Sequence, residues 1–201
     1  MTMRFALLGF LLFTIATPGL GGDREAFEKE NNHLPHLHFQ RHLRSLGSTA
    51  SRVLMTNHGG NVIHAGSTMA IFWGSQWSNS TFAGDKISGI DAFFSGFPGS
   101  RYSTTSQEYT DKTGNVSGQA AYAGHVIDTT AVPNKALTTS QAISEACKIV
   151  GNNPDPNAIY FIYTASGAGT VSYCAWHSWG SCSNGKPIQV AYMPNLDGVS
   201  G

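Results

Sequence analysis

The densest set of side chains that could do chemistry lies near the C-terminal end of the chain, at residues 173–182. Cys174 and Cys182 enclose Trp176, His177 and Trp179. A histidine in this setting could be a ligand, an acid or base, or a packed core residue. Tryptophan suits a place where its apolar face is buried and its N–H finds a partner. The run predicts a disulfide-closed Trp/His corner whose rings could contact a ligand, but by itself it names no reaction.

The first 22 residues have the three-part pattern of a secretory signal peptide. A short basic start at 1–4 precedes an apolar stretch at 5–16, and small residues with a turn follow at 17–22. The apolar stretch is only about 12 residues long, whereas a membrane span needs about 20. We therefore expect cleavage between Ala16 and Gly22, secretion to the extracellular space, and no membrane association of the mature protein.

Secretion would place the three cysteines in an oxidising compartment, where pairing is favoured. We expect Cys174 to pair with Cys182, because the short segment between them closes easily around Gly180. Cys147 is then left over, which implies a free thiol, an intermolecular partner, or a partner missing from this sequence. Zinc is the rival interpretation, but no cysteine pair has the close spacing of metal ligands.

Composition restricts the partners. Twelve basic residues balance twelve acidic ones, and only 12% of residues are charged, so neither nucleic acid nor an anionic membrane is an implied partner. Twenty-three glycines are typical of a turn-rich extracellular domain. Asn79 and Asn115 each begin a glycosylation sequon, usable where the loop is exposed and the host glycosylates.

The chain divides into three parts. After the signal peptide, residues 23–52 are acidic and then basic with no sustained apolar face, which is typical of a polar leader or pro-segment. Residues 53–201 form the domain, long enough for one core. The leader histidines could bind zinc or copper, but we expect a solvated segment, because nothing there can preorganise a metal site. These histidines are His33, His36, His38 and His42.

The domain pattern predicts an α+β fold with a mixed central sheet and two amphipathic helices. Apolar spacing predicts a helix over 82–97, with Asp85 near its start, and a second helix capped by Thr139 or Ser140 and ended by Gly151. Apolar runs bounded by turn residues predict strands, the first of them central, and the turn 184–185 separates the last two. The expected strands are 68–73, 122–128, 158–163, 171–176 and 188–193.

Four segments together resemble the secreted proteins related to the plant EXORDIUM (phosphate-induced) family. They are Thr-Asn-His-Gly-Gly at 56–60, Ala-Ile-Phe-Trp-Gly at 70–74, Gly-His-Val-Ile-Asp at 124–128 and Cys-Ala-Trp-His at 174–177. The family opens its domain with a His-Gly-Gly turn and an apolar strand ending in Trp-Tyr-Gly or Trp-Gly, and a Cys-Ala-Trp segment follows later. The resemblance covers about residues 53–197 and implies a role at a cell surface or wall.

Members of the wider group continue beyond a segment like residues 195–198, with another cysteine and a helix of the pattern Ser-His-Glu-x-x-Glu-Ala that looks like a zinc-peptidase helix. This sequence stops at Gly201, so the resemblance implies a C-terminally incomplete domain in which a missing cysteine could pair with Cys147. No His and Glu of the domain are spaced as metal ligands on one helix face. We therefore assign no catalytic residue, metal ligand or cofactor. Zinc and a metallopeptidase-like hydrolase belong only to a longer form.

Further candidates come with structural alternatives. The rings of Trp77 and Trp179 could join Trp73, Trp176 and Tyr102 in a face that stacks on a cell-wall glycan. The stronger expectation is that Trp73 and Trp176 are packed in the core and that only Trp77 and Trp179 reach the surface. His58 is retained as a ligand-contacting candidate beside the glycine turn, where histidines are usually structural, as is His64.

Two catalytic arrangements are disfavoured. His125 and Asp128 should lie on opposite faces of one strand, which argues against an acid/base pair. Ser166 lacks the Gly-x-Ser-x-Gly elbow of a serine hydrolase. The sequence predicts an extracellular, non-catalytic protein whose partner is a wall glycan or another extracellular protein, with a hydrolase fragment and a glycan-binding module as alternatives.

Overall fold

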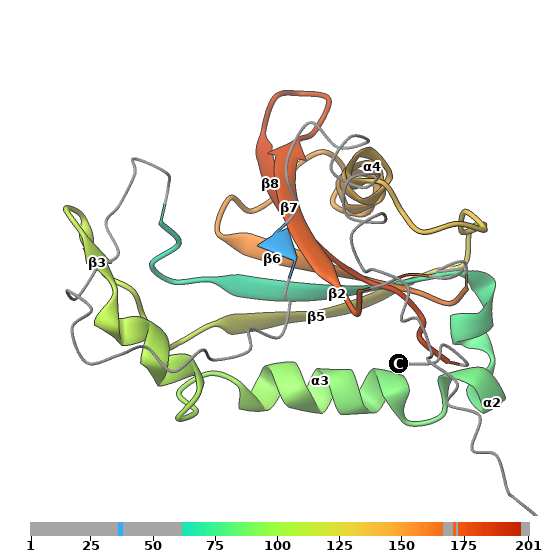
Figure 1. The fold of residues 1–201 in the computed structure, drawn as a ribbon, viewed down its shortest axis with the longest axis horizontal. Helices are drawn as coiled ribbons and strands as arrows, with labels where there is room; N and C mark the ends of the chain where they lie inside the picture. Colours follow the sequence, from blue (N-terminus) through green and yellow to red (C-terminus); the bar gives the residue numbers. More distant parts are fainter. Residues whose placement is uncertain (1–35, 38–61, 167–170, 172, 198–201) are drawn as a thin grey trace, which may run out of the picture.

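The fold is α+β with a mixed sheet, as predicted (Figure 1). The computed structural model describes residues 36–37, 62–166, 171 and 173–197. Within these residues, six strands form one sheet in the order β1-β7-β8-β6-β2-β5. The strands are β1 (His36–Leu37), β2 (Ser67–Trp73), β5 (Ala121–Asp128), β6 (Ala158–Thr164), β7 (Trp176–Ser181) and β8 (Pro187–Met193).

The centre of the sheet is parallel and one side is antiparallel. Strand β2 pairs in parallel with β5 and β6, and β6 pairs in parallel with β8. Strand β7 pairs antiparallel with β8 and with β1, so residues 36–37 of the expected leader extend the sheet. Since β2 lies between β5 and β6, its predicted central place is confirmed.

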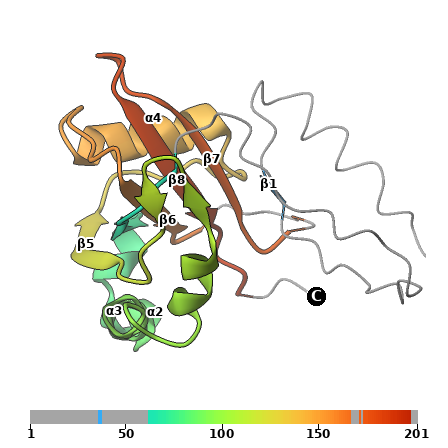
Figure 2. The ribbon, with the colours of Figure 1, turned by 90° about the vertical axis from the view of Figure 1, so that its left-hand side faces the viewer.

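The two longer helices cover opposite faces of the sheet (Figure 2). Helix α3 (Lys86–Gly96) belongs to the connection from β2 to β5, and α4 (Thr139–Ile149) to the crossover from β5 to β6. From β2 the chain passes to β5 on one side of it, and from β5 it crosses over β2 to β6 on the other side. Because parallel crossover connections are right-handed, two connections that run in opposite directions across the sheet place their helices on opposite faces. The shorter elements are η1 (Ser75–Ser78), α2 (Ser80–Ala83), η2 (Ser103–Glu108), β3 (Thr110–Asp111) and β4 (Gly114–Asn115).

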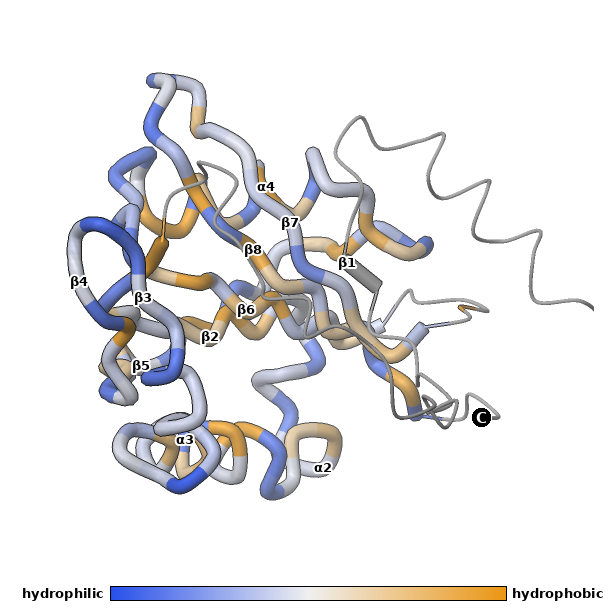
Figure 3. Tube along the Cα trace, turned by 60° about the vertical axis from the view of Figure 1, so that its left-hand side comes forward, coloured by the Kyte–Doolittle hydropathy of each residue, from blue (hydrophilic) through white to orange (hydrophobic). Residues whose placement is uncertain are grey.

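The alternation of side chains along β2 supplies both halves of the core. Ala70 and Phe72 pack into the cluster on the α3 side, and Ile71 and Trp73 into the cluster on the α4 side. Phe72 and Ile71 are fully buried, and burying each such side chain stabilises the fold by about 1.5–3 kcal/mol. The apolar colouring in Figure 3 accordingly runs along the central strands.

The helix predictions hold in outline and fail in detail. The expected helix over 82–97 is divided into α2 and α3, because Gly84 adopts a positive φ of 51°. Asp85 is the N-cap residue of α3, but its side chain makes no capping bond. Helix α4 is capped by Thr138, one residue earlier than expected, through a reciprocal capping box with Gln141. Gly151 follows its end with a φ of 60°, as predicted.

The strand predictions at 68–73, 122–128, 158–163 and 188–193 are confirmed within two residues. The prediction of a strand at 171–176 is wrong, because the strand is β7, which begins at Trp176. Its inward positions after Trp176 are Ser178 and Gly180, whose small side chains give no apolar signal. The turn at 184–185 is confirmed: Gly185 has a φ of 79°, and its N–H donates to the carbonyl of Cys182 over 2.9 Å.

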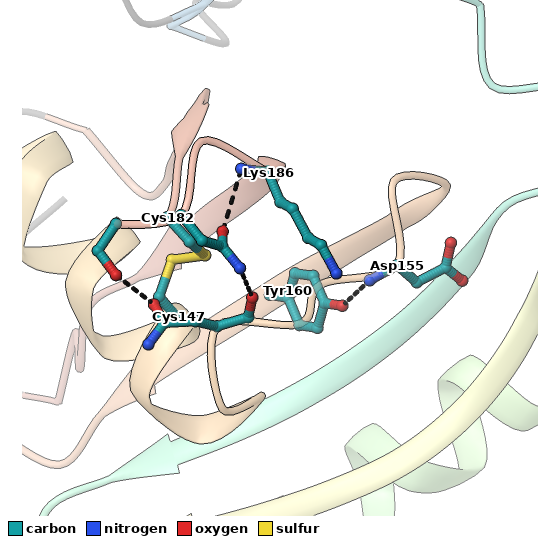
Figure 4. The surroundings of a disulfide bond; sticks show 8 residues. Cys147, Asp155, Tyr160, Cys182 and Lys186 are labelled. Carbon is teal, nitrogen blue, oxygen red and sulfur yellow. Dashed lines mark hydrogen bonds between the residues drawn. A yellow bond between two sulfur atoms is a disulfide. The ribbon is translucent and has the colours of Figure 1, made fainter.

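The disulfide prediction is wrong, and with it the disulfide-closed Trp/His corner. Cys182 pairs with Cys147 of α4, with 5.6 Å between their Cα atoms (Figure 4). The thiol of Cys174 is free and exposed. Strand β7 lies between Cys174 and Cys182, and an extended chain rises about 3.3 Å per residue. The ends of such a strand are much further apart than the roughly 7 Å that a disulfide spans.

Candidate functional site

The structure separates the tryptophans that the sequence analysis grouped. Trp176 is 1% exposed and packs on Tyr192, with ring centroids 5.4 Å apart. Trp179 is 58% exposed and, three residues along an extended strand, lies on the opposite face of β7. Trp77, expected at the surface, is 6% exposed, and its indole N–H donates to the carbonyl of Tyr163 over 3.0 Å. These rings form no common platform for a glycan.

The remaining predicted positions are scattered. His177 is partly buried on β7, opposite Ala191 of β8, whereas His58 lies outside the described residues. Asn79 and Asn115 are both exposed, so their glycosylation stays a prediction. Asn79 also caps α2, since its side-chain oxygen accepts the N–H of Thr81.

The polar cluster with the deepest burial was not expected from sequence. Asp128 ends β5, and α4 brings Glu145 and Lys148 against it. The Lys148 ammonium donates to the Asp128 carboxylate and lies 2.6 Å from Glu145 Oε2. The two acidic residues are only 8% and 4% exposed. The one signal for this cluster in the sequence is the spacing of Glu145 and Lys148, three residues apart on a predicted helix. The same spacing is found on exposed helix faces, so it does not indicate a buried cluster.

Thr130 completes the cluster and ties it to the central strand. Its N–H and its hydroxyl donate to the two carboxylate oxygens of Asp128 over 2.9 and 2.8 Å. The Thr130 hydroxyl oxygen in turn accepts the indole N–H of Trp73 over 3.0 Å. Because Trp73 and Asp128 are register partners at the ends of two parallel strands, pairing alone brings them together. Lys148 also lies over the Trp73 ring, 5.5 Å from its centroid.

The two carboxyl groups are held in different protonation states. Burial, followed by the hydrogen bond with Asp128, raises the pKa of Glu145 to about 7, and the opposing effect of Lys148 is smaller. Burial acts in the same direction on Asp128, but hydrogen bonds from Glu145, Lys148 and Thr130 outweigh it and hold the pKa of Asp128 well below its usual range. Well below pH 7 the cluster therefore contains a carboxylate, an ammonium and a neutral carboxylic acid.

A pocket of about 340 Å³ opens beside this cluster. Glu145 and Lys148 form one part of its wall, and the ring of Trp73 forms another. The remaining wall comes from the first half of α4 and consists of Ser140, Gln141 and Ser144. The Oε1 atom of Glu145 is buried, and within the described residues no hydrogen-bond partner reaches it. The pocket therefore combines an aromatic wall with neutral and charged hydrogen-bonding groups.

A second polar cluster lies on the other face of the sheet, against α3. His125 Nδ1 lies 2.9 and 3.0 Å from the two carboxylate oxygens of Asp91, and the Tyr122 hydroxyl donates to the same carboxylate. Burial, followed by the bond and charge of Asp91, raises the pKa of Tyr122. Within the described residues no hydroxyl or thiol nucleophile bonds to this histidine.

A β-bulge assembles this second cluster. Tyr122 is the register partner of Thr68 and His125 that of Ala70, so three residues of β5 span two of β2. The extra residue puts Tyr122 and His125 on one face, and Gly124 accommodates the irregularity with a φ of 88°. Since the register is regular from His125 onward, Asp128 points to the α4 face, and the predicted separation of His125 from Asp128 is confirmed.

His64 belongs to a third, structural group. Its Nδ1 lies 3.0 Å from the carbonyl oxygen of Asn115, and its Nε2 lies 3.1 Å from Asp111 and 2.7 Å from the hydroxyl of Thr113. The backbone bond to Asn115, followed by Asp111, raises the pKa of His64. Both ring nitrogens are occupied in holding the β3–β4 hairpin, which agrees with the structural interpretation of this turn histidine.

No group of three or more His, Cys, Asp or Glu residues in the described part of the chain is arranged to hold a metal ion. Among the described helices, none combines the length and apolar character needed to cross a membrane. Comparisons with protein-family models, with curated proteins and with solved structures found no match.

Proposed function

We propose that this protein is a secreted, extracellular domain of the EXORDIUM-like group that acts by binding and not by catalysis. The observation that carries the proposal is the Cys147–Cys182 disulfide, whose two cysteines are each 5% exposed. Disulfides persist in oxidising compartments and are rare in the cytosol. A buried bridge between α4 and the β7–β8 hairpin therefore supports the export expected from the first 22 residues.

The EXORDIUM-like assignment is supported by where its motifs fall. Residues 70–74 form the end of the central strand and the residue after it, and residues 124–128 lie on the neighbouring strand β5. Gly74 has a φ of 121°, and a Cβ there would lie 2.8 Å from Ala165 Cβ. The Trp-Gly step in the motif thus has a structural reason, because only glycine fits where β2 ends.

Non-catalytic action is supported by the hydrogen bonds that the polar groups of each cluster make with one another. Asp128 accepts from Thr130 and Lys148, and Asp91 accepts from both Tyr122 and His125. Carboxylates engaged in this way orient and stabilise their neighbours. The hydrogen bonds of both clusters are consequently accounted for by structural support.

Expression of the full chain in a secreting eukaryotic host tests the proposal. We expect protein in the medium with a new N-terminus between residues 17 and 23, and a peptide linking Cys147 to Cys182 in non-reducing digests. A matched chain that starts at residue 23 should remain inside the cell and lack the bridge. Retention of the full chain in the cell, with both cysteines reduced, would contradict secretion.

The metallopeptidase alternative is tested on the same secreted protein. Stoichiometric zinc after extensive dialysis, together with proteolysis that a chelator abolishes, would overturn the non-catalytic proposal. Protein that is purified without zinc, and neither gains proteolysis on zinc addition nor loses stability with a chelator, would uphold it.

A further inference from the structure

The β3–β4 hairpin is held to the domain by polar contacts and not by a core. No residue from 109 to 117 is buried, and much of the hairpin carries the hydrophilic colour in Figure 3. A segment with little buried apolar surface can open locally at a lower free energy than global unfolding requires. The bonds that fix the hairpin to its neighbours therefore decide how often it is closed.

His64 makes several of these bonds from the segment that precedes β2. Its backbone carbonyl accepts the N–H of Ser117 over 2.6 Å, and its Nδ1 lies 3.0 Å from the carbonyl oxygen of Asn115. Its Nε2 lies 2.7 Å from the hydroxyl oxygen of Thr113 and 3.1 Å from Asp111 Oδ1. One imidazole ring thus contacts both β3 and β4.

The bonds around this ring require a proton on each of its nitrogens. Nδ1 faces a carbonyl oxygen, which can only accept, so Nδ1 must donate. Nε2, the Thr113 hydroxyl oxygen and Asp111 Oδ1 form a closed triangle, in which the hydroxyl lies 2.6 Å from the carboxylate oxygen. With a neutral ring that donates from Nδ1, the hydroxyl hydrogen is the single proton in the triangle, and one close contact has none. The imidazolium supplies the second proton and completes both bonds.

The charges beside the ring favour the same protonated form. Bonds from the hydroxyl and the N–H of Thr113, followed by the contact with His64, lower the pKa of Asp111 to about 2 against the opposing effect of burial, so this side chain stays ionised. The carbonyl of Asn115, followed by Asp111, raises the pKa of His64, again against burial. Below neutral pH the contact is therefore an ion pair supported by hydrogen bonds.

The other charged groups around this segment leave the pair undisturbed. Lys112 follows Asp111 in the hairpin, and Glu108 ends η2 just before it, and both side chains are exposed. On the β6 side, the carboxylate of Asp155 accepts from the Ser67 hydroxyl and from the N–H of Asn157. Within the described residues, the charged group that contacts the ring is Asp111.

We propose that protonation of His64 is a pH switch that clamps the β3–β4 hairpin to the segment before β2. The ordinary pKa of histidine is 6.5, and the pKa of His64 in the closed hairpin is higher, so the closed form binds the proton more strongly than the open form. The clamp is complete below about pH 6.5 and is lost as the pH rises through the raised pKa. The switch thereby changes the presentation of the hairpin, which carries the sequon at Asn115, between acidic and alkaline surroundings. The inference does not depend on secretion, because it uses only the contacts of the ring.

NMR of the full chain, isotope-labelled, from about pH 5.5 to about pH 8 tests the proposal. We expect the His64 ring to titrate above pH 6.5, with both ring nitrogens protonated below the transition. Hydrogen exchange of the Ser117 and Val116 amides reports opening, because in the closed hairpin they donate to the carbonyls of His64 and Tyr109. Protection factors, which are corrected for the intrinsic effect of pH on exchange, should be at least about threefold lower at the higher pH.

Two histidine variants isolate the ring that carries the switch. His64→Gln can still donate to a carbonyl but does not titrate, and His125→Gln makes the same change at the ring that bonds to Asp91 on the α3 face. We expect His64→Gln to abolish the pH dependence of the two hairpin protection factors and His125→Gln to retain it. Dispersed amide signals from β6 establish that both variants are folded.

Three outcomes would overturn the proposal. The first is titration of the His64 ring at or below pH 6.5. The second is equal protection of the Ser117 and Val116 amides at the two ends of the pH range. The third is a pH dependence of hairpin protection that persists in His64→Gln. Secretion, tested on the same protein, can succeed or fail independently of all three.

Discussion

Glu145 shows how burial changes the chemistry of a single residue. An exposed glutamate is ionised at neutral pH, but this carboxyl group is 4% exposed, and its pKa is raised to about 7, first by burial and then by Asp128. Protonation lets it donate a hydrogen bond to the Asp128 carboxylate instead of repelling it. The residue thus stabilises the cluster only while it keeps its proton.

The free energy of unfolding should therefore depend on pH through Glu145. Its ordinary pKa is 4.5 and its pKa in the fold is about 7, so between these values the folded state binds more protons than the unfolded state. Its stabilisation is complete below about pH 4.5 and is lost as the pH rises through about 7. Urea unfolding at about pH 5 and about pH 8 should show a decline up to about 3 kcal/mol larger in the wild type than in Glu145→Gln.

The difference between the two proteins isolates this residue, because other groups titrate in both. The low pKa of Asp128 gives a contribution that is present above its ordinary value of 3.8 and is lost only at lower pH, outside the tested window. His64, whose pKa is raised, contributes equally to both proteins. Identical pH dependence in the two would mean that Glu145 is already ionised in the fold at about pH 5.

At the scale of elements, two glycines of positive φ shape the ends and edges of the sheet for different reasons. Gly124 has a φ of 88° at the bulge of β5, and a Cβ there would meet nothing within 4 Å. Gly74 has a φ of 121° at the end of β2, where a Cβ would lie 2.8 Å from Ala165 Cβ and 3.0 Å from Val132 Cγ2. Gly124 is therefore required only by its backbone conformation, whereas Gly74 is required both by its backbone conformation and by close packing.

Alanine at these two positions should consequently differ in cost. Gly124→Ala meets only the strain of positive φ, and we expect a loss of about 1–2 kcal/mol in the free energy of unfolding. Gly74→Ala adds an overpacked contact with Ala165, and we expect a loss of about 3 kcal/mol or more. Urea midpoints at a constant m-value provide the measurement. Equal losses would show that the neighbours of Gly74 move aside at no cost.

At the scale of the whole molecule, the disulfide joins the helix on one face of the sheet to the hairpin at one side. The bond closes a loop with a sequence separation of 35, from α4 through β6 and β7. A cross-link of this span stabilises mainly by restricting the unfolded chain. Cys174 lies beyond the other end of β7 and takes no part in the bond.

Cysteine variants should therefore have sharply different effects. Cys182→Ser removes the bridge, and we expect it to lower the free energy of unfolding by about 3–4 kcal/mol. Cys174→Ser, at an exposed free thiol, should leave that free energy unchanged within about 0.5 kcal/mol. Urea unfolding of oxidised wild type, reduced wild type and both variants makes the comparison. A large loss in Cys174→Ser, equal to that in Cys182→Ser, would instead support the Cys174–Cys182 pairing expected from the sequence.

The sequence by itself determined most of the elements. Continuous apolar runs identified β2, β6 and β8, because a strand buried on both faces carries that pattern regardless of its neighbours. Helical apolar spacing identified α4, and glycine identified its end. The sequence did not predict β7 in its correct position, because its inward residues Ser178 and Gly180 are small and give no apolar pattern. Only the tertiary structure explains the glycine, since the side chain of Ile143 occupies the space that a Cβ of Gly180 would need.

Only the tertiary structure decided which residues meet. The Asp128–Glu145–Lys148 cluster joins a strand end to a helix, and the Asp91–Tyr122–His125 cluster depends on one bulge, so neither is encoded in local spacing. The disulfide follows the same rule: Cys174 and Cys182 are close along the chain but are held apart by the strand between them, whereas the fold brings Cys147 to Cys182. Local pattern sets the conformation of each segment, and packing between segments sets the contacts from which sites are made.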